Sequence, residues 1–487
     1  MEKIIGRIDE KKIFDTIYTK LSPQLVAIYG RRRVGKTFLI RNSFCNKGFY
    51  FEVTGIKKGP IEYQISNFIE AIADSFLNGE LPKEKPKNWM QAFSLLKNTI
   101  RDLRKNSEAK ITLFFDELPW LATSKSHFLT TLDHFYNNFI TRQKNIIVVI
   151  CGSAASWMIE NIINSKGGLH ARVTKEICLT PFNISETENY LLKKGIQYDK
   201  KQLIEIYMTI GGMPYYLDHI QSGLSAAQNI NNLFFTLNAP LKHEFHRIFR
   251  SLFDNYEFHI AVIKELVKRP SGLTQTEIVK RLKITHGHQI VKTLNELYYS
   301  GFIMALPNFK RTKKNIKYRL IDEFSAFSFH WLQDVDNYAF LTLNKDFWIK
   351  SYMSQQYKIW SGFSFENFCL KHITLLKKAL GISAVLTKES VWNASLAQNR
   401  HQIDLVIDRA DNCINLCEMK FYKTIFTVDK KYAEWLIKRK ELFISETGTK
   451  KTVFTTLITT YGAKNNSNLL NSVDNSLSIE DIFQSVV

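Results

Sequence analysis

The chain has 487 residues, 45% of them hydrophobic, and a formal net charge of +20 from 66 Lys and Arg against 46 Asp and Glu. This length predicts roughly two to four domains with packed cores. No apolar run reaches the length of a membrane span and MEKIIGRIDE has no signal-peptide pattern, so we expect a soluble, cytoplasmic protein that does not contact membranes.

The strong positive charge indicates a polyanionic partner, with nucleic acid as the first candidate and an acidic membrane as the second. A lysine-rich surface that only keeps the protein soluble is the alternative. The six cysteines are scattered and lie mostly inside apolar runs, which is typical of reduced core thiols. Cys413 and Cys417 have no second pair, so we do not predict a zinc site.

A phosphate-binding loop is the clearest motif, in the run VAIYGRRRVGKTFLI between an apolar strand and a helix expected from Phe38. Gly30 and Gly35 let successive backbone N–H groups turn toward phosphate oxygens. Lys36 is expected to reach the β- and γ-phosphates of ATP, and the Thr37 hydroxyl to bind Mg²⁺. We assign nucleotide contact to Gly30, Arg31, Arg32, Arg33, Val34, Gly35, Lys36, Thr37 and Phe38.

Two more apolar runs end in polar residues that complete an ATP site. Residues 111–115 read as a buried parallel strand followed by Asp116, a Mg²⁺ ligand, and Glu117, which would polarise the attacking water. The alternative is that this pair caps the next helix. Residues 146–150 lead to Ser153, a candidate contact for the γ-phosphate or the water, although an ordinary strand-to-helix turn explains it too.

The first half of the chain resembles a family, the AAA+-like P-loop ATPases of the archaeal and signal-transduction (STAND) type. Three segments carry the resemblance: IGRIDE with Gly6 and Arg7, GLHAR with Arg172, and GGMPYYL with Pro214. It implies that Gly6 and Arg7 lie against the adenine, that Arg172 is a phosphate-sensing or finger arginine, and that Pro214 belongs to a helical lid. Arg172 would act within its own subunit or on a neighbour, so a homo-oligomer is one expected arrangement.

The middle of the chain predicts a winged helix. Helices are expected over 257–267, 275–282 and 286–299, followed by strands at 301–306 and 316–321. In DNA-binding examples the third helix enters the major groove and the hairpin touches the backbone, whereas others only dock proteins. Expected groove contacts are His286, His288, Gln289 and Lys292, and expected phosphate contacts are Lys310, Arg311, Lys313 and Lys314.

The C-terminal part carries a second set of chemical residues: Glu366 on a helix expected to start near Trp360, Asp404 on a strand, and Glu418 and Lys420 two apart on the next strand. This ordered set resembles the PD-(D/E)xK restriction-endonuclease-like nucleases. The resemblance implies that Asp404 and Glu418 bind a divalent metal, that Lys420 positions the attacking water, and that Glu366 assists. Surface charge on edge strands is the alternative.

Taken together, the sequence predicts an α/β protein with a P-loop NTPase parallel sheet, a helical lid, a winged helix and a restriction-endonuclease-like domain. The expected boundaries are 1–180 for the ATPase core, 181–250 for the lid, 251–322 for the winged helix, 323–358 for an aromatic-rich helical linker and 359–487 for the nuclease-like domain. The whole arrangement resembles prokaryotic ATPases that carry a nuclease-like C-terminal domain.

The predicted function is an ATP-hydrolysing switch that binds DNA and cleaves it, with ATP and Mg²⁺ as cofactors and a second Mg²⁺ or Mn²⁺ at the C-terminal site. Two alternatives stay open. In one, the chain is an ATPase whose nuclease-like domain is catalytically dead and binds DNA or protein. In the other, the chain is an ATP-controlled DNA-binding regulator.

Overall fold

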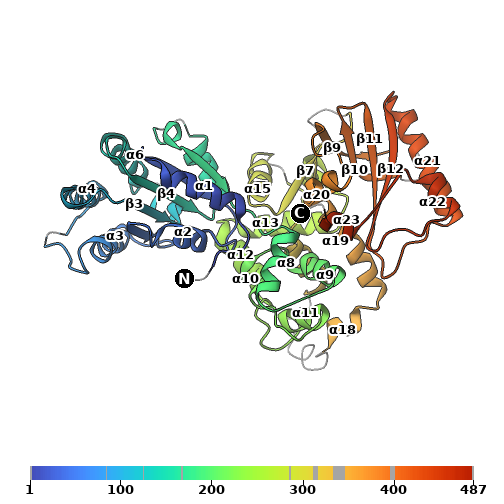
Figure 1. Cartoon of the computed structure of the whole chain (residues 1–487), viewed down its shortest axis with the longest axis horizontal. Helices are drawn as coiled ribbons and strands as arrows, with labels where there is room; N and C mark the ends of the chain where they lie inside the picture. Colours follow the sequence, from blue (N-terminus) through green and yellow to red (C-terminus); the bar gives the residue numbers. More distant parts are fainter. Residues whose placement is uncertain are drawn as a thin grey trace. The chain divides into compact units, whose positions relative to one another are not determined.

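The computed structural model divides into two compact units, Met1–Pro181 and Phe182–Val487, which are described separately (Figure 1). The structure describes residues 3–83, 85–123, 125–165, 168–284, 287–310, 316–332, 346–394 and 401–484. His286, Arg311, Lys313 and Lys314 were predicted DNA contacts and lie outside these ranges. Among the described helices, none is both long and apolar enough to cross a membrane.

The first unit is built on a parallel five-stranded sheet in the order β2-β3-β4-β1-β5. Its strands are β1 (Gln24–Tyr29), β2 (Phe49–Thr54), β3 (Ile111–Asp116), β4 (Ile146–Gly152) and β5 (Lys175–Cys178). Its helices are α1 (Ile8–Thr19), α2 (Lys36–Phe44), α3 (Ile61–Phe76), α4 (Trp89–Asn106), α5 (Leu118–Leu121), α6 (Phe128–Asn138) and α7 (Ala155–Met158), with short irregular turns at Ile140–Arg142, Ile159–Ile163 and His170–Arg172.

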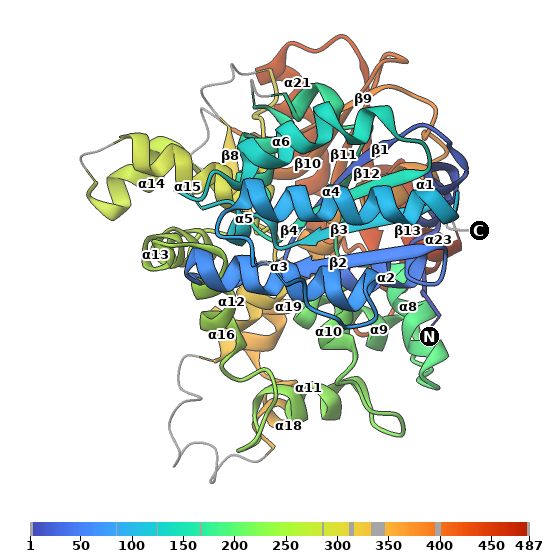
Figure 2. The ribbon, with the colours of Figure 1, turned by 90° about the vertical axis from the view of Figure 1, so that its left-hand side faces the viewer.

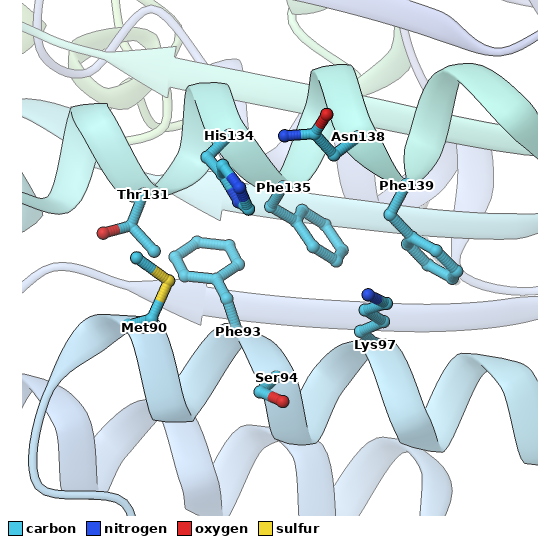
Figure 3. Close-up of a pocket in the computed structure, with 9 residues that line it drawn as sticks. All are labelled: Met90, Phe93, Ser94, Lys97, Thr131, His134, Phe135, Asn138 and Phe139. Carbon is cyan, nitrogen blue, oxygen red and sulfur yellow. The ribbon is translucent and has the colours of Figure 1, made fainter.

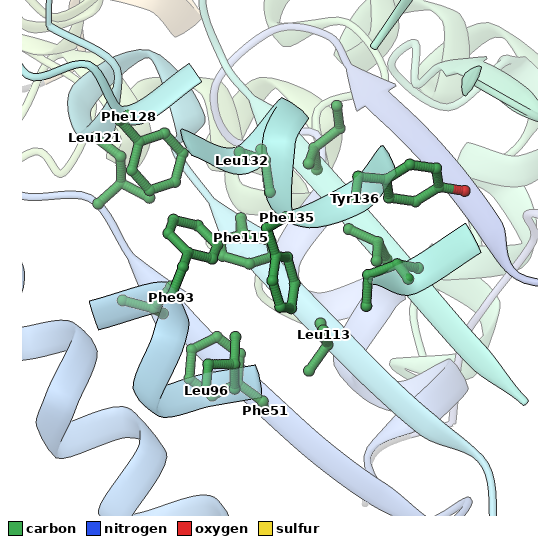
Figure 4. Close-up of a cluster of buried hydrophobic side chains, with 14 of the residues drawn as sticks. Phe51, Phe93, Leu96, Leu113, Phe115, Leu121, Phe128, Leu132, Phe135 and Tyr136 are labelled. Carbon is green, nitrogen blue, oxygen red and sulfur yellow. The ribbon is translucent and has the colours of Figure 1, made fainter. Parts of the chain in front are cut away.

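Both faces of this sheet are covered, as expected for parallel strands whose residues are apolar without interruption. Figure 2 shows α3, α4 and α6 in front of the central strands, and these helices share one core with them. Phe51, Phe93 and Phe115 lie at its centre (Figure 4). On α1 and α2, Phe14 and Phe44 are in contact, with ring centroids 5.1 Å apart. The strands are therefore held rigidly, and the positions of their carboxyl ends are fixed.

A hollow of about 160 Å³ opens between α4 and α6 at the edge of the same core (Figure 3). Phe93, Phe135 and Phe139 form its apolar wall, and Lys97 and His134 lie at its mouth. The Lys97 ammonium lies 5.8 Å from the centroid of the Phe139 ring. None of the lining residues belongs to the phosphate-binding loop, so this hollow is separate from the predicted nucleotide site.

The second unit begins with helices and continues into two smaller sheets. Its helices are α8 (Ile184–Lys193), α9 (Lys200–Ile210), α10 (Pro214–Leu217), α11 (Ala226–Phe234), α12 (Glu244–Leu252), α13 (Tyr256–Val267), α14 (Gln275–Leu282), α15 (Gly287–Tyr299), α16 (Glu323–Trp331), α18 (Phe347–Ser351), α19 (Gln355–Lys371), α20 (Ile373–Ala379), α21 (Lys430–Thr447), α22 (Ser467–Ser472) and α23 (Ile479–Gln484). The helix that carries Glu366 thus begins at Gln355, earlier than the sequence suggested, because Ser354 caps it.

A three-stranded antiparallel sheet accompanies α13–α15 in the order β6-β8-β7. Strand β6 (Leu273–Thr274) lies between α13 and α14, and β7 (Ile303–Leu306) and β8 (Lys317–Leu320) follow α15. Thr274 and Glu277 form a reciprocal capping box that starts α14. Ile290, Leu294 and Leu297 are buried on one face of α15. We name this part, residues 256–320 as far as they are described, the helix–hairpin module.

A second five-stranded sheet, in the order β13-β12-β11-β10-β9, forms the C-terminal part. Its strands are β9 (Thr387–Asn393), β10 (Gln402–Arg409), β11 (Cys413–Lys420), β12 (Thr452–Thr459) and β13 (Asn475–Ser478). The pairs β9–β10 and β10–β11 are antiparallel, whereas β11–β12 and β12–β13 are parallel. Figure 1 shows this sheet between α21 and α22 on one side and α19, α20 and α23 on the other.

The aromatic-rich linker packs into this unit. Trp331, Trp348 and Trp360 are each at most 4% exposed. Their rings form one cluster, with Trp348 centred 5.0 Å from Trp331 and 5.5 Å from Trp360. Because these rings are covered by protein, they stabilise the packing of α16, α18 and α19 and have no free face on which a base would stack.

Candidate functional site: a nucleotide site and an acidic centre

The phosphate-binding loop joins the end of β1 to α2, and two glycines make its path possible. Gly30 has φ +146°, and a Cβ there would lie 2.2 Å from the Leu179 carbonyl oxygen. Gly35 has φ +88° and is the N-cap of α2. The helix therefore begins at Lys36, two residues before the expected Phe38, which places Lys36 and Thr37 in its first turn, where backbone N–H groups are free to bind anions.

The Lys36 side chain lies inside the loop. Its Nζ donates hydrogen bonds to the carbonyl oxygens of Gly30, at 2.8 Å, and Arg31, at 3.0 Å, and the residue is 6% exposed. A buried ammonium held only by neutral carbonyls gains most from a nearby anion, because its charge is otherwise uncompensated. This position suits contact with a phosphate group.

Thr37 and Asp116 meet across the sheet. Thr37 Oγ1 donates a hydrogen bond to Asp116 Oδ2 at 2.6 Å, although the two residues come from α2 and from the end of β3. A hydroxyl and a carboxylate are oxygen ligands of the kind that Mg²⁺ prefers. The backbone N–H of Glu117 donates to Asp116 Oδ1 at 2.9 Å, which fixes the carboxylate orientation.

Glu117 and Ser153 form the next contact. Ser153 donates to Glu117 from its Oγ, at 2.6 Å to Oε1 and 2.7 Å to Oε2, and from its backbone N–H, at 3.1 Å to Oε2. Glu117 is the N-cap residue of α5 but makes no side-chain cap hydrogen bond. The structure therefore does not support the helix-cap alternative for the acidic pair. Ser153 contacts the carboxylate that we expected to polarise water.

The phosphate-binding loop and Glu117 line a hollow of about 340 Å³ in the first unit. Its walls are Arg32, Arg33, Gly35, Lys36, Thr37, Phe38 and Glu117. Three of these side chains are cationic and one is anionic, so the hollow favours a polyanion. Beneath it, burial raises the pKa of the Cys151 thiol well above its ordinary value, so this cysteine acts as an inert core residue.

The N-terminal motif lies beside the loop. Gly6 and Arg7 both have positive φ, +63° and +54°, and the Arg7 guanidinium donates to the Val34 carbonyl oxygen at 3.0 Å. Arg172 lies elsewhere, where its Nε donates to Asn137 Oδ1 on α6 at 2.8 Å. Pro214 is the first residue of α10 and belongs to the second unit.

The structure brings together the acidic residues predicted in the C-terminal part. The register of β10 and β11 pairs Leu405 with Cys417, so Asp404 and Glu418 follow one step further along the same pair of strands. Glu366 on α19 lies near both. We name Glu366, Asp404, Glu418 and the neighbouring Lys420 the acidic centre.

Two arginines that the sequence did not single out contact the acidic centre. Arg319 on β8 donates to Glu366 Oε2 at 2.8 Å and to Asp404 Oδ1 at 3.3 Å. Arg439 on α21 donates to Glu418 Oε2 at 2.5 Å. The sequence contains only a weak indication of these contacts, because Arg319 is one arginine in a short strand and Arg439 is one of many basic residues on its helix.

The pKa values of Glu366 and Glu418 are shifted in opposite directions. Burial and the neighbouring Asp404 raise the pKa of Glu366 to about 7, against the opposing effect of Arg319. For Glu418, burial alone would raise the pKa, but Arg439 and Lys420 outweigh it and lower the pKa to about 2. Over the ranges that the structure describes, no three or more His, Cys, Asp or Glu side chains are grouped so as to hold a metal ion.

The predicted DNA-contacting residues on α15 form an exposed surface. His288, Gln289 and Lys292 are all exposed, and Lys292 Nζ lies 3.9 Å from Glu296. Lys310, four residues after the end of β7, is also exposed and donates to the Thr447 carbonyl oxygen at 2.9 Å.

Comparison with known proteins finds similarity to ATPases in the N-terminal part of the chain. Residues 7–220 match the family model described as ATPase domain predominantly from Archaea. An uncharacterized protein of Methanocaldococcus jannaschii is 25% identical over 219 residues, which are 45% of this chain and 44% of that protein. The chain therefore matches less than half of the length of this curated relative.

Solved structures are similar at lower identity. The Walker-type ATPase paby2304 of Pyrococcus abyssi is 16% identical, with a TM-score of 0.45 over 66% of this chain and 95% of that one. The ORC2 protein of Aeropyrum pernix is 14% identical, with a TM-score of 0.44 over 71% and 97%. The sequence match and the parallel sheet with its loop support an archaeal-type ATPase domain in the N-terminal part of the chain.

Proposed function

We propose that the protein is an ATP-hydrolysing switch that binds DNA. The hydrogen-bonded series Thr37–Asp116–Glu117–Ser153 carries the first half of this proposal, because it places a metal-binding pair beside a carboxylate at the ends of three neighbouring strands. Ligands of parallel α/β sheets bind at these carboxyl ends. The positive hollow around Lys36 supplies the electrostatics that a nucleotide triphosphate requires.

In the proposed reaction Lys36 binds the β- and γ-phosphates, and Thr37 and Asp116 hold Mg²⁺, which neutralises charge on the phosphate oxygens. Glu117 accepts a hydrogen bond from the attacking water, with its carboxylate oriented by Ser153. Gly6 and Arg7 flank the base, and Arg172 and Pro214 respond to the γ-phosphate through subunit or lid rearrangement.

Paired variants test this half. Lys36→Ala should lose nucleotide binding, whereas Glu117→Gln should keep binding and lose turnover by about 100-fold or more. Fluorescent-nucleotide titration and phosphate release measure the two effects separately. Glu108→Gln, a carboxamide control in the loop before β3, should leave both unchanged. Wild-type turnover in Glu117→Gln would contradict the assignment.

The DNA-binding half rests on the helix–hairpin module. Three helices and an antiparallel hairpin are the arrangement of a winged helix, and α15 presents His288, Gln289 and Lys292 to solvent. Lys310 extends the same positive character to the hairpin. We assign the major-groove contact to α15 and the backbone contacts to the hairpin, including Arg311, Lys313 and Lys314.

Salt dependence tests this assignment. Lys292→Ala with Lys310→Ala should reduce the slope of log affinity against log salt concentration by about two contacts. Lys85→Ala with Lys87→Ala, two exposed lysines of the first unit, is the charge-matched control and should leave the slope unchanged. An equal loss in both double variants would place the DNA site elsewhere.

A second candidate function, metal-dependent DNA cleavage, is favoured by the meeting of Glu366, Asp404, Glu418 and Lys420 from α19, β10 and β11. A restriction-endonuclease-like site requires such a group around a divalent metal. Asp404→Ala and Lys420→Ala should each abolish cleavage in Mg²⁺ or Mn²⁺ and leave ATP hydrolysis intact. Glu366→Ala should be milder. No cleavage of single-stranded, double-stranded or branched DNA by the wild type would favour the binding-only alternative.

A further inference from the structure

Arg319 is held by three directional hydrogen bonds. Its Nε donates to Asn367 Oδ1 at 2.7 Å, its Nη2 to Glu366 Oε2 at 2.8 Å and its Nη1 to Asp404 Oδ1 at 3.3 Å. The side chain is 2% exposed. A planar guanidinium that bridges two carboxylates in this way occupies the space between them.

Both carboxylate oxygens of Glu418, the third acidic residue of the centre, also accept from protein donors. Glu418 accepts from Arg439 at 2.5 Å, from Lys420 at 2.9 Å and from the Tyr432 hydroxyl at 2.9 Å. Arg439 is 2% exposed and also donates to the Gln402 carbonyl oxygen at 3.3 Å. The Gln402 amide in turn donates to Asp404 Oδ1 at 2.6 Å.

This centre therefore has no local excess of negative charge. Three carboxylates, of Glu366, Asp404 and Glu418, face three cations, of Arg319, Arg439 and Lys420. A divalent ion needs free carboxylate oxygens and a local excess of negative charge. Here Glu366 Oε2, Asp404 Oδ1 and both oxygens of Glu418 accept from protein donors, and the Arg319 guanidinium lies between Glu366 and Asp404, so a metal shared by these two carboxylates would have to displace a buried cation.

We propose that Arg319 is an internal cation that takes the place of a divalent metal between Glu366 and Asp404, so that the helix–hairpin module closes the acidic centre. The proposal rests on the proposed cleavage function and adds its regulation: the metal enters only when Arg319 leaves. Asp404 is then the ligand that the metal gains, and Glu366 assists it.

The position of Arg319 in the fold explains how opening would be coupled to DNA. It lies on β8, the central strand of the β6-β8-β7 sheet, where it pairs with Met304 of β7. A backbone displacement at Arg319 therefore moves the small sheet, and with it α15, which packs on β7. A polyanion bound to α15 and the hairpin would therefore displace β8, the strand that carries Arg319.

Manganese binding to the full-length, nucleotide-free chain tests the proposal. The background carries Asp116→Asn, which removes the carboxylate beside Thr37 and so suppresses the metal site of the first unit. Wild-type Arg319, Arg319→Met and Arg319→Lys are compared by the paramagnetic resonance signal of free Mn²⁺. A second version of each chain also carries Asp404→Asn, because Mn²⁺ binding in the acidic centre must depend on that carboxylate.

We expect Arg319→Met to bind one Mn²⁺ at least about 100-fold more tightly than the Arg319 chain, because a unit positive charge has left the immediate neighbourhood of the site. Asp404→Asn should abolish this binding. Arg319→Lys keeps the positive charge, so its acidic centre should bind Mn²⁺ no more tightly than that of the Arg319 chain. Mn²⁺ should also raise the melting temperature of Arg319→Met and leave that of the Arg319 chain unchanged.

Tight, Asp404-dependent Mn²⁺ binding to the Arg319 chain would overturn the proposal, as would a folded Arg319→Met that binds no Mn²⁺. If Arg319→Met does not fold, Arg319→Gln replaces it, and the titration of the Arg319 chain still decides the question. Cleavage assays separate the two ideas. If Arg319→Met binds Mn²⁺ but cuts no DNA, the proposed cleavage function is contradicted and the closing role of Arg319 stands. If the wild type binds Mn²⁺ and cuts DNA, only the closing role of Arg319 is contradicted.

Discussion

Ser153 Oγ lies 2.6 Å from Glu117 Oε1, although the two residues end different strands, β4 and β3. The contact exists because β4 and β3 are neighbours in the sheet, so that the residues that follow the two strands lie side by side. We therefore expect Ser153 to act on the proposed nucleotide site through Glu117.

Ser153→Ala should lower the rate constant of ATP hydrolysis by about 10- to 100-fold, because the Glu117 carboxylate loses the hydroxyl that orients it. Nucleotide affinity should change little, since Lys36 and Thr37 are untouched. Single-turnover phosphate release and nucleotide titration measure the two quantities. Ser156→Ala, at a buried serine of α7, is the control. A loss of affinity equal to the loss of rate would instead mean that Ser153 contacts the nucleotide.

Gly30→Ala should destabilise the first unit by about 3 kcal/mol, since it combines a left-handed φ with a collision at the Leu179 carbonyl. Gly79→Ala is the matched control, because Gly79 has φ +83° but nothing within 4 Å of a Cβ. It should cost about 1 kcal/mol. Calorimetric melting compares them, and equal losses would show that the close approach of Leu179 contributes nothing.

Arg439→Met should destabilise the second unit by about 3 kcal/mol, because it leaves the buried Glu418 carboxylate with Lys420 and Tyr432 alone. The double variant Arg439→Met with Glu418→Gln should recover part of this loss, since no uncompensated charge is left. Urea unfolding followed by tryptophan fluorescence measures both. A double variant that is less stable than the sum of the single ones would contradict this view of the pair.

His372 predicts a pH dependence. Its Nε2 accepts from the Ile184 backbone N–H at 3.1 Å, its Nδ1 lies 2.8 Å from the Phe368 carbonyl oxygen, and burial lowers its pKa from 6.5 to about 4. The folded state thus binds fewer protons than the unfolded state between these values. The contribution of neutral, buried His372 to the free energy of unfolding is complete above pH 6.5. It is lost as the pH falls toward 4, by about 3 kcal/mol in total.

His372→Gln has no group that titrates in this window, so its stability should fall less steeply between pH 6.5 and 4 than that of the wild type. Its stability at pH 8 will be lower, because one of the two hydrogen bonds is lost. Melting temperatures measured across this range compare the slopes. Parallel curves would show that His372 is not the group responsible.

Local patterns were sufficient to predict the strand–loop–helix of the proposed nucleotide site. The loop glycines, Lys36 and Thr37 stand in an unbroken motif, and a continuous apolar run identified the strand that ends at Asp116. The helix start moved from Phe38 to Lys36 because Gly35 takes the N-cap position, a detail of backbone conformation that the motif does not contain. The residue assignments within this site stay predictions until the variants are measured.

By itself, the sequence determined the elements that depend on neighbours along the chain: the strand–loop–helix around Lys36, the helices and hairpin strands of the middle part, and the strands that carry Asp404 and Glu418. Only the tertiary structure decided what those residues meet. Arg319 reaches Asp404 from 85 residues away, and Arg439 reaches Glu418 from the middle of α21. Ion pairs of this kind leave no periodic signal, because they depend on how separate elements pack, and hydrophobic patterning specifies which face is buried without specifying which buried charges face one another.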